Sequence, residues 1–151
     1  MEGLLSKTEK ATFFIPGDPV AKGRPKTRIM GKHVQIYTPT KTRKWEDYVR
    51  CFALEAFLKS GIKTWEDCPV RMNITFFMSR PKSHTKKQKL CPYCFRKPDR
   101  DNLEKSISDA IEGLFFKNDG QICDGMITKY YAEEPQEPGV YVELAKIETD
   151  E

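Results

Sequence analysis

Two kinds of hydrophobic spacing divide the chain into short segments. Apolar side chains cluster or alternate over residues 12–15, 34–37, 70–78, 121–131 and 140–147, which predicts five β-strands. Apolar residues recur every three or four positions over residues 38–60 and again over 99–114, which predicts two helices. The predicted order ββαβαββ is typical of a single α+β domain in which two helices pack on one small mixed sheet.

The first predicted helix has signals at both ends and an apolar stripe between them. Thr38 is expected as its N-cap, with Pro39 at the first helical position, and Gly61 lies just past its end. The predicted buried stripe consists of Trp45, Val49, Phe52, Ala53, Ala56 and Phe57. Residues 70–78 follow, and their apolar side chains predict the central strand of the sheet.

The second predicted helix separates an apolar face from a charged face. The apolar face consists of Leu103, Ile107, Ala110, Ile111 and Leu114. On the opposite face Asp101, Lys105 and Asp109 follow one another at i, i+4 and i+8, which places them about 6 Å apart along one ridge. Pro98 disfavours helix at the residue before it, so Asp99 and Asp101 flank a corner between loop and helix.

These charged residues have two interpretations. In the first, Asp99 is the helix N-cap, and Asp101 and Lys105 form an ordinary surface ion pair. In the second, the clustered carboxylates hold a hard cation such as Mg²⁺, which needs only a few carboxylates together with water and substrate phosphate. A chain that combines clustered aspartates with basic segments elsewhere is a candidate for metal-dependent cleavage of a polyanion.

Positive charge is concentrated in two segments of the chain, whose formal net charge is +4. Residues 19–45 contain eight Lys or Arg and no acid, and residues 79–98 contain seven and no acid. The last twenty-one residues reverse this balance, with seven acids against Lys146. A surface that only keeps a protein soluble usually mixes the two signs. The segregation therefore predicts contact with nucleic-acid phosphates.

Seven cations are candidate DNA contacts. Four of them alternate along the first basic segment, so an extended chain would direct them all to one side: Lys22, Arg24, Lys26 and Arg28. Such a row suits a DNA backbone, and a mobile basic loop is the alternative. Residues 79–97 form a long basic connection without periodicity, expected to embrace DNA just before the acidic corner. Its candidate contacts are Lys86, Lys87 and Lys97.

The length of the chain fits one domain over residues 1–151, with a hydrophobic core of its own. The polar residues 1–10 are expected to be flexible. No apolar run reaches the length of a membrane span, and the N-terminus lacks the core of a signal peptide. A cytoplasmic location without a membrane partner is therefore expected.

The cysteines do not predict a disulfide scaffold, because their number is odd and no export signal precedes them. Cys51 and Cys123 lie in predicted apolar elements and are expected in or near the core. Cys91 and Cys94 form a C-x₂-C knuckle, which is half of a tetrahedral zinc site. The nearest further ligands are His84 and Cys68, at spacings of no standard module. Two knuckles in a dimer would complete a Cys₄ site, and a redox-sensitive loop is the alternative.

The acidic corner also contains motifs of specific spacing. They are Pro98-Asp99-Arg100-Asp101-Asn102-Leu103-Glu104-Lys105, then Asp109-Ala110-Ile111-x-Gly113, then Asn118-Asp119-Gly120-Gln121-Ile122. Two weaker motifs stand near the N-terminus, Ile15-Pro16-Gly17-x-Pro19 and Lys22-Gly23-Arg24-Pro25. Together these motifs resemble the RusA-type Holliday-junction resolvases, and the resemblance covers roughly residues 12 to 131.

The resemblance implies a dimeric, Mg²⁺-dependent endodeoxyribonuclease of a kind often carried by prophages. Its partners would be branched DNA (a four-way junction) and a second copy of the chain, with Mn²⁺ as a substitute metal and no nucleotide cofactor. In the family the catalytic carboxylates fall at the positions of Asp99, Asp101 and Asp119, and an essential lysine at Lys105. Asp109 is a further candidate ligand. Asn118 departs from the pattern, since some relatives carry a second acid there.

The sequence leaves three functions open. The first is resolution of Holliday junctions by Mg²⁺-dependent hydrolysis of phosphodiesters. The second is a nuclease with a different preference, for flaps or other branches, because basic segments alone cannot choose a junction over a duplex. The third is a non-catalytic DNA-binding protein whose loop is held by zinc at Cys91 and Cys94.

Overall fold

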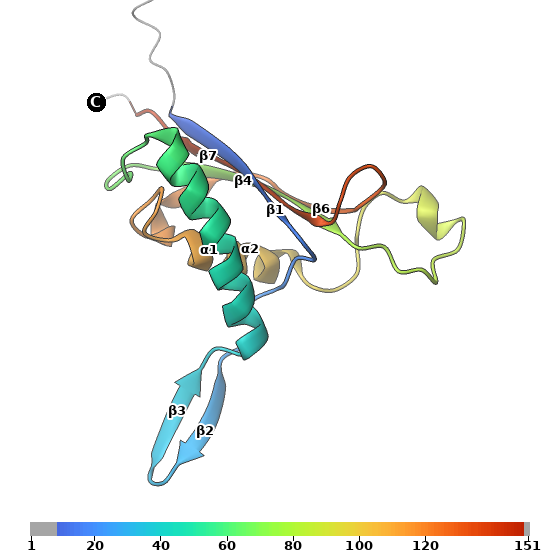
Figure 1. The fold of residues 1–151 in the computed structure, drawn as a ribbon, viewed down its shortest axis with the longest axis horizontal. Helices are drawn as coiled ribbons and strands as arrows, with labels where there is room; N and C mark the ends of the chain where they lie inside the picture. The colour runs from blue at the N-terminus through green and yellow to red at the C-terminus, as the bar shows by residue number, and fades with distance from the viewer. Residues whose placement is uncertain (1–8, 150–151) are drawn as a thin grey trace, which may run out of the picture.

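The alternating segments of the sequence form one mixed sheet and a separate hairpin, and the helical segments form two helices (Figure 1). The structure, a computed structural model, describes residues 9–149. The elements are β1 (Lys10–Pro16), β2 (Lys26–Met30), β3 (His33–Tyr37), α1 (Thr40–Ser60), β4 (Val70–Met78), the 3₁₀ helix η2 (Gln88–Leu90), α2 (Arg100–Ile111), the 3₁₀ helix η3 (Asp119–Gln121), β5 (Ile122–Asp124), β6 (Ile127–Tyr131) and β7 (Gly139–Lys146). The flexibility expected for residues 1–10 falls on residues outside this range, except for Glu9 and Lys10, and Lys10 begins β1.

The sheet is mixed, with β4 near its centre as the sequence predicts. Its order is β1-β7-β4-β5, and β6 also pairs with β4. Strand β7 is antiparallel to both β1 and β4, whereas β5 and β6 are parallel to β4. The predicted α+β class is confirmed.

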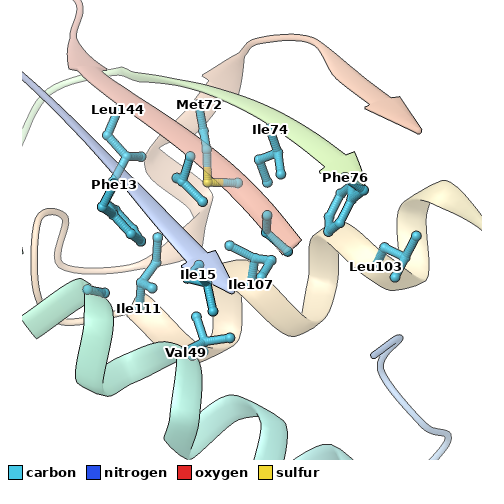
Figure 2. Close-up of a cluster of buried hydrophobic side chains, with 14 of the residues drawn as sticks. Phe13, Ile15, Val49, Met72, Ile74, Phe76, Leu103, Ile107, Ile111 and Leu144 are labelled. Carbon is cyan, nitrogen blue, oxygen red and sulfur yellow. The ribbon is translucent and has the colours of Figure 1, made fainter. Parts of the chain in front are cut away.

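The core lies between the sheet and the helices. Alternate side chains of β4 are buried, as the spacing predicts, and α2 faces them with Leu103, Ile107 and Ile111, all fully buried. Figure 2 shows these side chains meeting against the sheet, with Val49 of α1 reaching the same cluster. Because the apolar face of α2 is used in this way, its charged face must point outward.

Helix α1 begins at Thr40, so the prediction of Thr38 as its N-cap is wrong. The N-cap is Pro39, which is extended at φ −53° and ψ 142°, and no side chain caps the helix among the described residues. The Oγ1 of Thr42 instead accepts a hydrogen bond from the backbone N–H of Gly23. The predicted Gly61 end is confirmed, with the left-handed φ of 71° that favours glycine. Of the predicted stripe only Trp45, Val49 and Ala53 are buried. Cys51 is exposed, contrary to expectation.

Residues 121–131 form two short strands, not the single strand predicted. Gly125 separates them at φ 143°, and a Cβ built there would lie 1.9 Å from the carbonyl oxygen of Met72. Only glycine allows the chain to pass β4 so closely, and this passage interrupts the pairing. Cys123, in the first of the two strands, is exposed and not near the core as expected.

The first basic segment forms a hairpin, which adds one strand to the predicted order. Strands β2 and β3 pair with each other and with no other strand among the described residues, and they project beyond the first turn of α1 (Figure 1). The pairing puts Ile29 opposite Val34 on one face, and Arg28 opposite Gln35 on the other. Lys22 and Arg24 precede β2, so the predicted row of four cations is reduced to Lys26 and Arg28.

The long basic loop over residues 79–97 is organised around Arg80. Its guanidinium donates to the carbonyls of Gln88 and Cys91, pairs with Glu133 at 2.6 Å and lies 4.3 Å from the ring centroid of Tyr131. The side chain is only 9% exposed. The loop is therefore a folded unit, held from its inner side by one buried cation.

Candidate active site on the second helix

The corner before α2 leaves two carboxylates exposed. Asp99 occupies the N-cap position and is extended at φ −68° and ψ 145°, but its side chain caps no described N–H of the helix. Its backbone carbonyl accepts the N–H of Leu103 at 3.1 Å. Asp101 follows in the first turn, where its Oδ1 accepts the N–H of Asn102. Asp99 is therefore the N-cap residue, as the first interpretation predicts, but its side chain makes no capping hydrogen bond.

Lys105 lies between two carboxylates from different parts of the chain. Its Nζ is 3.0 Å from Oδ1 of Asp109, one turn further along α2, and 3.0 Å from Oδ2 of Asp119 in η3. Hydrogen bonds from Lys105 to Asp119 first, and to Asp109 second, raise the lysine pKa well above its usual range. No ion pair joins Asp101 to Lys105 within residues 9–149, so the expected surface pair does not form.

Asp109 is shared with a second lysine, which the sequence assigned to DNA contact. Its Oδ2 is 3.2 Å from Nζ of Lys22, and the same ammonium lies 2.6 Å from Oε1 of Glu46 in α1. Burial opposes the charge of Lys22, but hydrogen bonds to Glu46 and Asp109 outweigh it and raise the lysine pKa. Lys22 therefore does not project into solvent with Lys26 and Arg28.

The position of Asp119 is fixed by the turn that carries it. The side-chain oxygen of Gln121 accepts the N–H groups of Lys117 and Asn118, and its amide donates to the carbonyls of Trp65 and Cys68. The Asn118 side chain caps η3 in return, which gives this departure from the family pattern a structural role. The N–H of Asp119 itself donates to Glu112.

A polar cavity of about 190 Å³ opens between α2 and η3. Its lining consists of Asp101, Glu104, Lys105, Ser108, Asp119 and Ile122. Sequence reasoning missed Glu104, a half-buried carboxyl three residues after Asp101 and so on the same side of the helix. Burial is the largest cause of its raised pKa; the charge of Arg100 opposes the rise, and that of Asp101 adds to it.

The carboxylates of this cavity suit a hard cation in chemistry but are not gathered around one point. Among residues 9–149, no three His, Cys, Asp or Glu side chains are arranged to hold a metal ion. Asp101 and Asp119 share the cavity, whereas Asp99 is not part of its lining. Mg²⁺ requires only one or two carboxylates when water and substrate phosphate complete its shell. The donors present fit such a site.

The cysteine knuckle has no third ligand within the described part of one chain. The Sγ of Cys91 lies 3.6 Å from the carbonyl of Tyr93, and the buried Sγ of Cys94 lies 3.9 Å from that of Arg96. Both thiols are free. A single chain therefore does not supply the zinc site considered from the sequence.

The remaining candidate DNA contacts are exposed but lie on separate elements. Arg24 precedes the hairpin and Lys26 and Arg28 belong to it, while Lys86, Lys87 and Lys97 belong to the loop before α2. Arg28 donates from Nε to Gln35 and lies 5.3 Å from the ring centroid of Tyr37, which holds its side chain along the hairpin. No helix within residues 9–149 is long and apolar enough to span a membrane.

The fold and this charged cavity define a small α+β protein with an acidic cavity on its second helix, and comparison with known proteins makes the class specific. The family model for the endodeoxyribonuclease RusA matches residues 16–145, so the chain belongs to the RusA endodeoxyribonuclease family. The chain is also similar to the uncharacterized protein YqaN of Bacillus subtilis (strain 168). The two are 34% identical over 131 residues, which cover 82% of this chain and 89% of YqaN.

Proposed function

We propose that this protein is a Mg²⁺-dependent endonuclease that resolves four-way DNA junctions by hydrolysing phosphodiesters. The observation that carries the proposal is the cavity between α2 and η3 that Asp101, Lys105 and Asp119 line together, with Lys105 paired to Asp119. Membership of the RusA family supports a nuclease, and the separate basic elements support a phosphate-rich partner.

In this proposal Asp101 and Asp119 would hold the metal, and Asp99 would be a further ligand from the N-cap position. Asp109 orients Lys105 through their ion pair. When bound, Mg²⁺ lowers the pKa of a coordinated water and neutralises charge on the phosphate; Mn²⁺ would substitute. Lys105 presents its ammonium to the scissile phosphate or the leaving oxygen as a point charge. The half-buried Glu104 also lines the cavity.

The proposed DNA contacts are Arg24, Lys26, Arg28, Lys86, Lys87 and Lys97. A homodimer with two-fold symmetry would present two such sites to two opposed strands of a junction, which is the arrangement that symmetric resolution needs. The hairpin projects from the domain beyond the first turn of α1 (Figure 1), and the side chains of all six residues are exposed in the single chain.

The test is a nicking assay on a synthetic four-way junction, with flap, fork and linear duplex DNA of the same sequence as comparisons. We expect paired nicks across the junction with Mg²⁺ and none with EDTA. Equal cleavage of flaps and junctions would replace the proposal with a general branch nuclease. Binding of every substrate without cleavage of any, in Mg²⁺ or Mn²⁺, would replace it with a non-catalytic DNA-binding protein.

A further inference from the structure

Five side chains of alternating charge form a continuous line from α1 to the candidate site. In order they are Glu46, Lys22, Asp109, Lys105 and Asp119, and the joining N–O distances are 2.6, 3.2, 3.0 and 3.0 Å. The side chains at the α1 end are the less exposed, with 18% for Glu46, 23% for Lys22 and 21% for Asp109. Charges in such partly buried pairs are screened less by solvent than ordinary surface pairs.

Lys22 is placed in this line by its backbone as well as by its side chain. Its N–H donates to the carbonyl of Asn102 in α2 at 2.8 Å. The buried hydroxyl of Ser106, one turn further along the same helix, donates to the carbonyl of Val20 at 2.8 Å. The segment before the hairpin is therefore attached to the helix that carries Lys105.

We propose that Lys22 is a positioning residue for Lys105. This inference rests on the function proposed above. Asp109 has one carboxylate and two ammonium partners, so each partner reduces the attraction left for the other. With Lys22 in place, Asp109 still orients Lys105 but attracts it less strongly, so the Lys105 ammonium keeps its position between Asp109 and Asp119 and can also pair with a phosphate.

Glu46 has the opposite effect in this arrangement. It competes with Asp109 for Lys22, so it limits how far Lys22 neutralises Asp109. Removing the charge of Lys22 should tighten the contact between Asp109 and Lys105, whereas removing the charge of Glu46 should loosen it. If Lys22 and Glu46 only stabilised the fold, removing their charges would not change the Asp109–Lys105 contact in opposite directions.

The first experiment uses the full chain without DNA or metal, so its result does not depend on the proposed activity. Exchange of the Lys105 ammonium protons with water is measured by NMR, with the signal assigned by its loss in Lys105→Gln. Compared with the unaltered protein, we expect exchange to be slower in Lys22→Met and faster in Glu46→Gln. Lys22→Arg should stay close to the unaltered protein, because a guanidinium keeps the charge between the two carboxylates.

The second experiment separates positioning from phosphate contact. For Lys22→Met, we expect cleavage at saturating DNA to fall about tenfold, less than the loss of a direct donor would cause, and Lys22→Arg should restore most of it. The salt dependence of junction binding should not change, since no phosphate contact is lost. Lys59→Met is the matched control, because it removes a lysine from an exposed ion pair with Glu55 on α1.

Three results would overturn the inference. One is a shift of Lys105 exchange in the same direction for Lys22→Met and Glu46→Gln, or no shift in either. Another is a shallower salt dependence for Lys22→Met with normal cleavage at saturation, which would make Lys22 a phosphate contact. The third is failure of Lys22→Arg to restore a cleavage rate lost in Lys22→Met. If neither the unaltered protein nor any variant cleaves DNA, the proposed function fails. The exchange experiment still tests the role of Lys22, because it needs neither DNA nor metal.

Discussion

The charged face of α2 and the β2–β3 hairpin both present cations on the surface, but they hold them in different ways. Lys105 and Lys22 have two carboxylate partners each, supplied by elements that pack on the core. Lys26 and Arg28 have no carboxylate at ion-pair distance among residues 9–149, and their strands lie outside the main sheet. The α2 face fixes the positions of its charges, whereas the hairpin leaves its charges free to contact a partner.

The difference corresponds to two tasks in the proposed function. A charge that acts on a reacting phosphate must be held within a fraction of an ångström of its place, which requires a rigid support. A charge that contacts the DNA backbone needs only to be exposed and of the right sign. If this division is correct, substitutions in the two regions will change different measurements.

The largest effect is expected from Asp101→Asn on the α2 face. The amide removes a charged metal ligand and no phosphate contact, so Mg²⁺-dependent cleavage should fall by at least about a thousandfold, while junction binding stays near normal. Rates on a four-way junction and a binding isotherm in Ca²⁺ provide the two measurements. Near-normal cleavage would remove Asp101 from the site.

Lys105→Ala should lose on the order of a hundredfold in cleavage at saturating DNA, because a charge next to the transition state is removed. Lys105 is half exposed, and its truncation leaves no cavity, so the free energy of unfolding should change by less than about 1 kcal/mol. Urea denaturation checks the stability. Lys105→Arg should recover little activity, since the guanidinium is longer and planar. Normal cleavage by Lys105→Ala, or an unfolded variant, would assign the residue to a structural ion pair.

The paired change Lys26→Ala and Arg28→Ala should alter binding and not the cleavage rate at saturation. The slope of log affinity against log salt should become shallower by roughly two, about 0.9 for each lost phosphate contact. At 150 mM salt this corresponds to a loss of roughly thirtyfold in affinity. Val34→Thr, on the opposite face of the same hairpin, is the control. An unchanged slope would show that the hairpin does not contact DNA.

The smallest effect is expected from Gln121→Ala, which tests the support of Asp119. Four hydrogen bonds are lost, so the free energy of unfolding should fall by about 1–3 kcal/mol. Cleavage should fall by less than in Lys105→Ala, because the carboxylate remains but its turn is loosened. Gln136→Ala is the matched control, because the exposed side-chain amide of Gln136 donates, among residues 9–149, only to the carbonyl of Glu137. Equal stability of the two variants would contradict a supporting role for Gln121.

The parts of the fold that the sequence predicted are those where apolar spacing decides the structure. The alternation of Val70, Met72, Ile74 and Phe76 identified the central strand, and the period of Leu103 and Ile107 identified the helix that covers it. The break in residues 121–131 was missed because it depends on the distance between Gly125 and the carbonyl of Met72, residues 53 positions apart. The hairpin was missed as a two-stranded element because its exposed residues have no buried side from which a period can be read.

The candidate site was predictable where its residues follow one another along one helix. Lys105 and Asp109 were placed correctly on one ridge, where the structure joins them in an ion pair. The partners from distant segments, Lys22 and Glu46, could not be found by spacing, because only the packing of α1 and the preceding segment on α2 brings them there. Catalytic and metal-binding roles remain predictions.

The position of β7 has a consequence for how the protein is made. Among residues 9–149 this strand is the last element, yet it lies between β1, the first element of that range, and the central β4. Until β7 has left the ribosome, β1 has no neighbour in the sheet, and one edge of β4 has no hydrogen-bonded partner strand. Long-range pairing of this kind slows folding and exposes strand edges on the way. The growing chain is therefore expected to need protection from aggregation until β7 has been synthesised and can pair with β1 and β4.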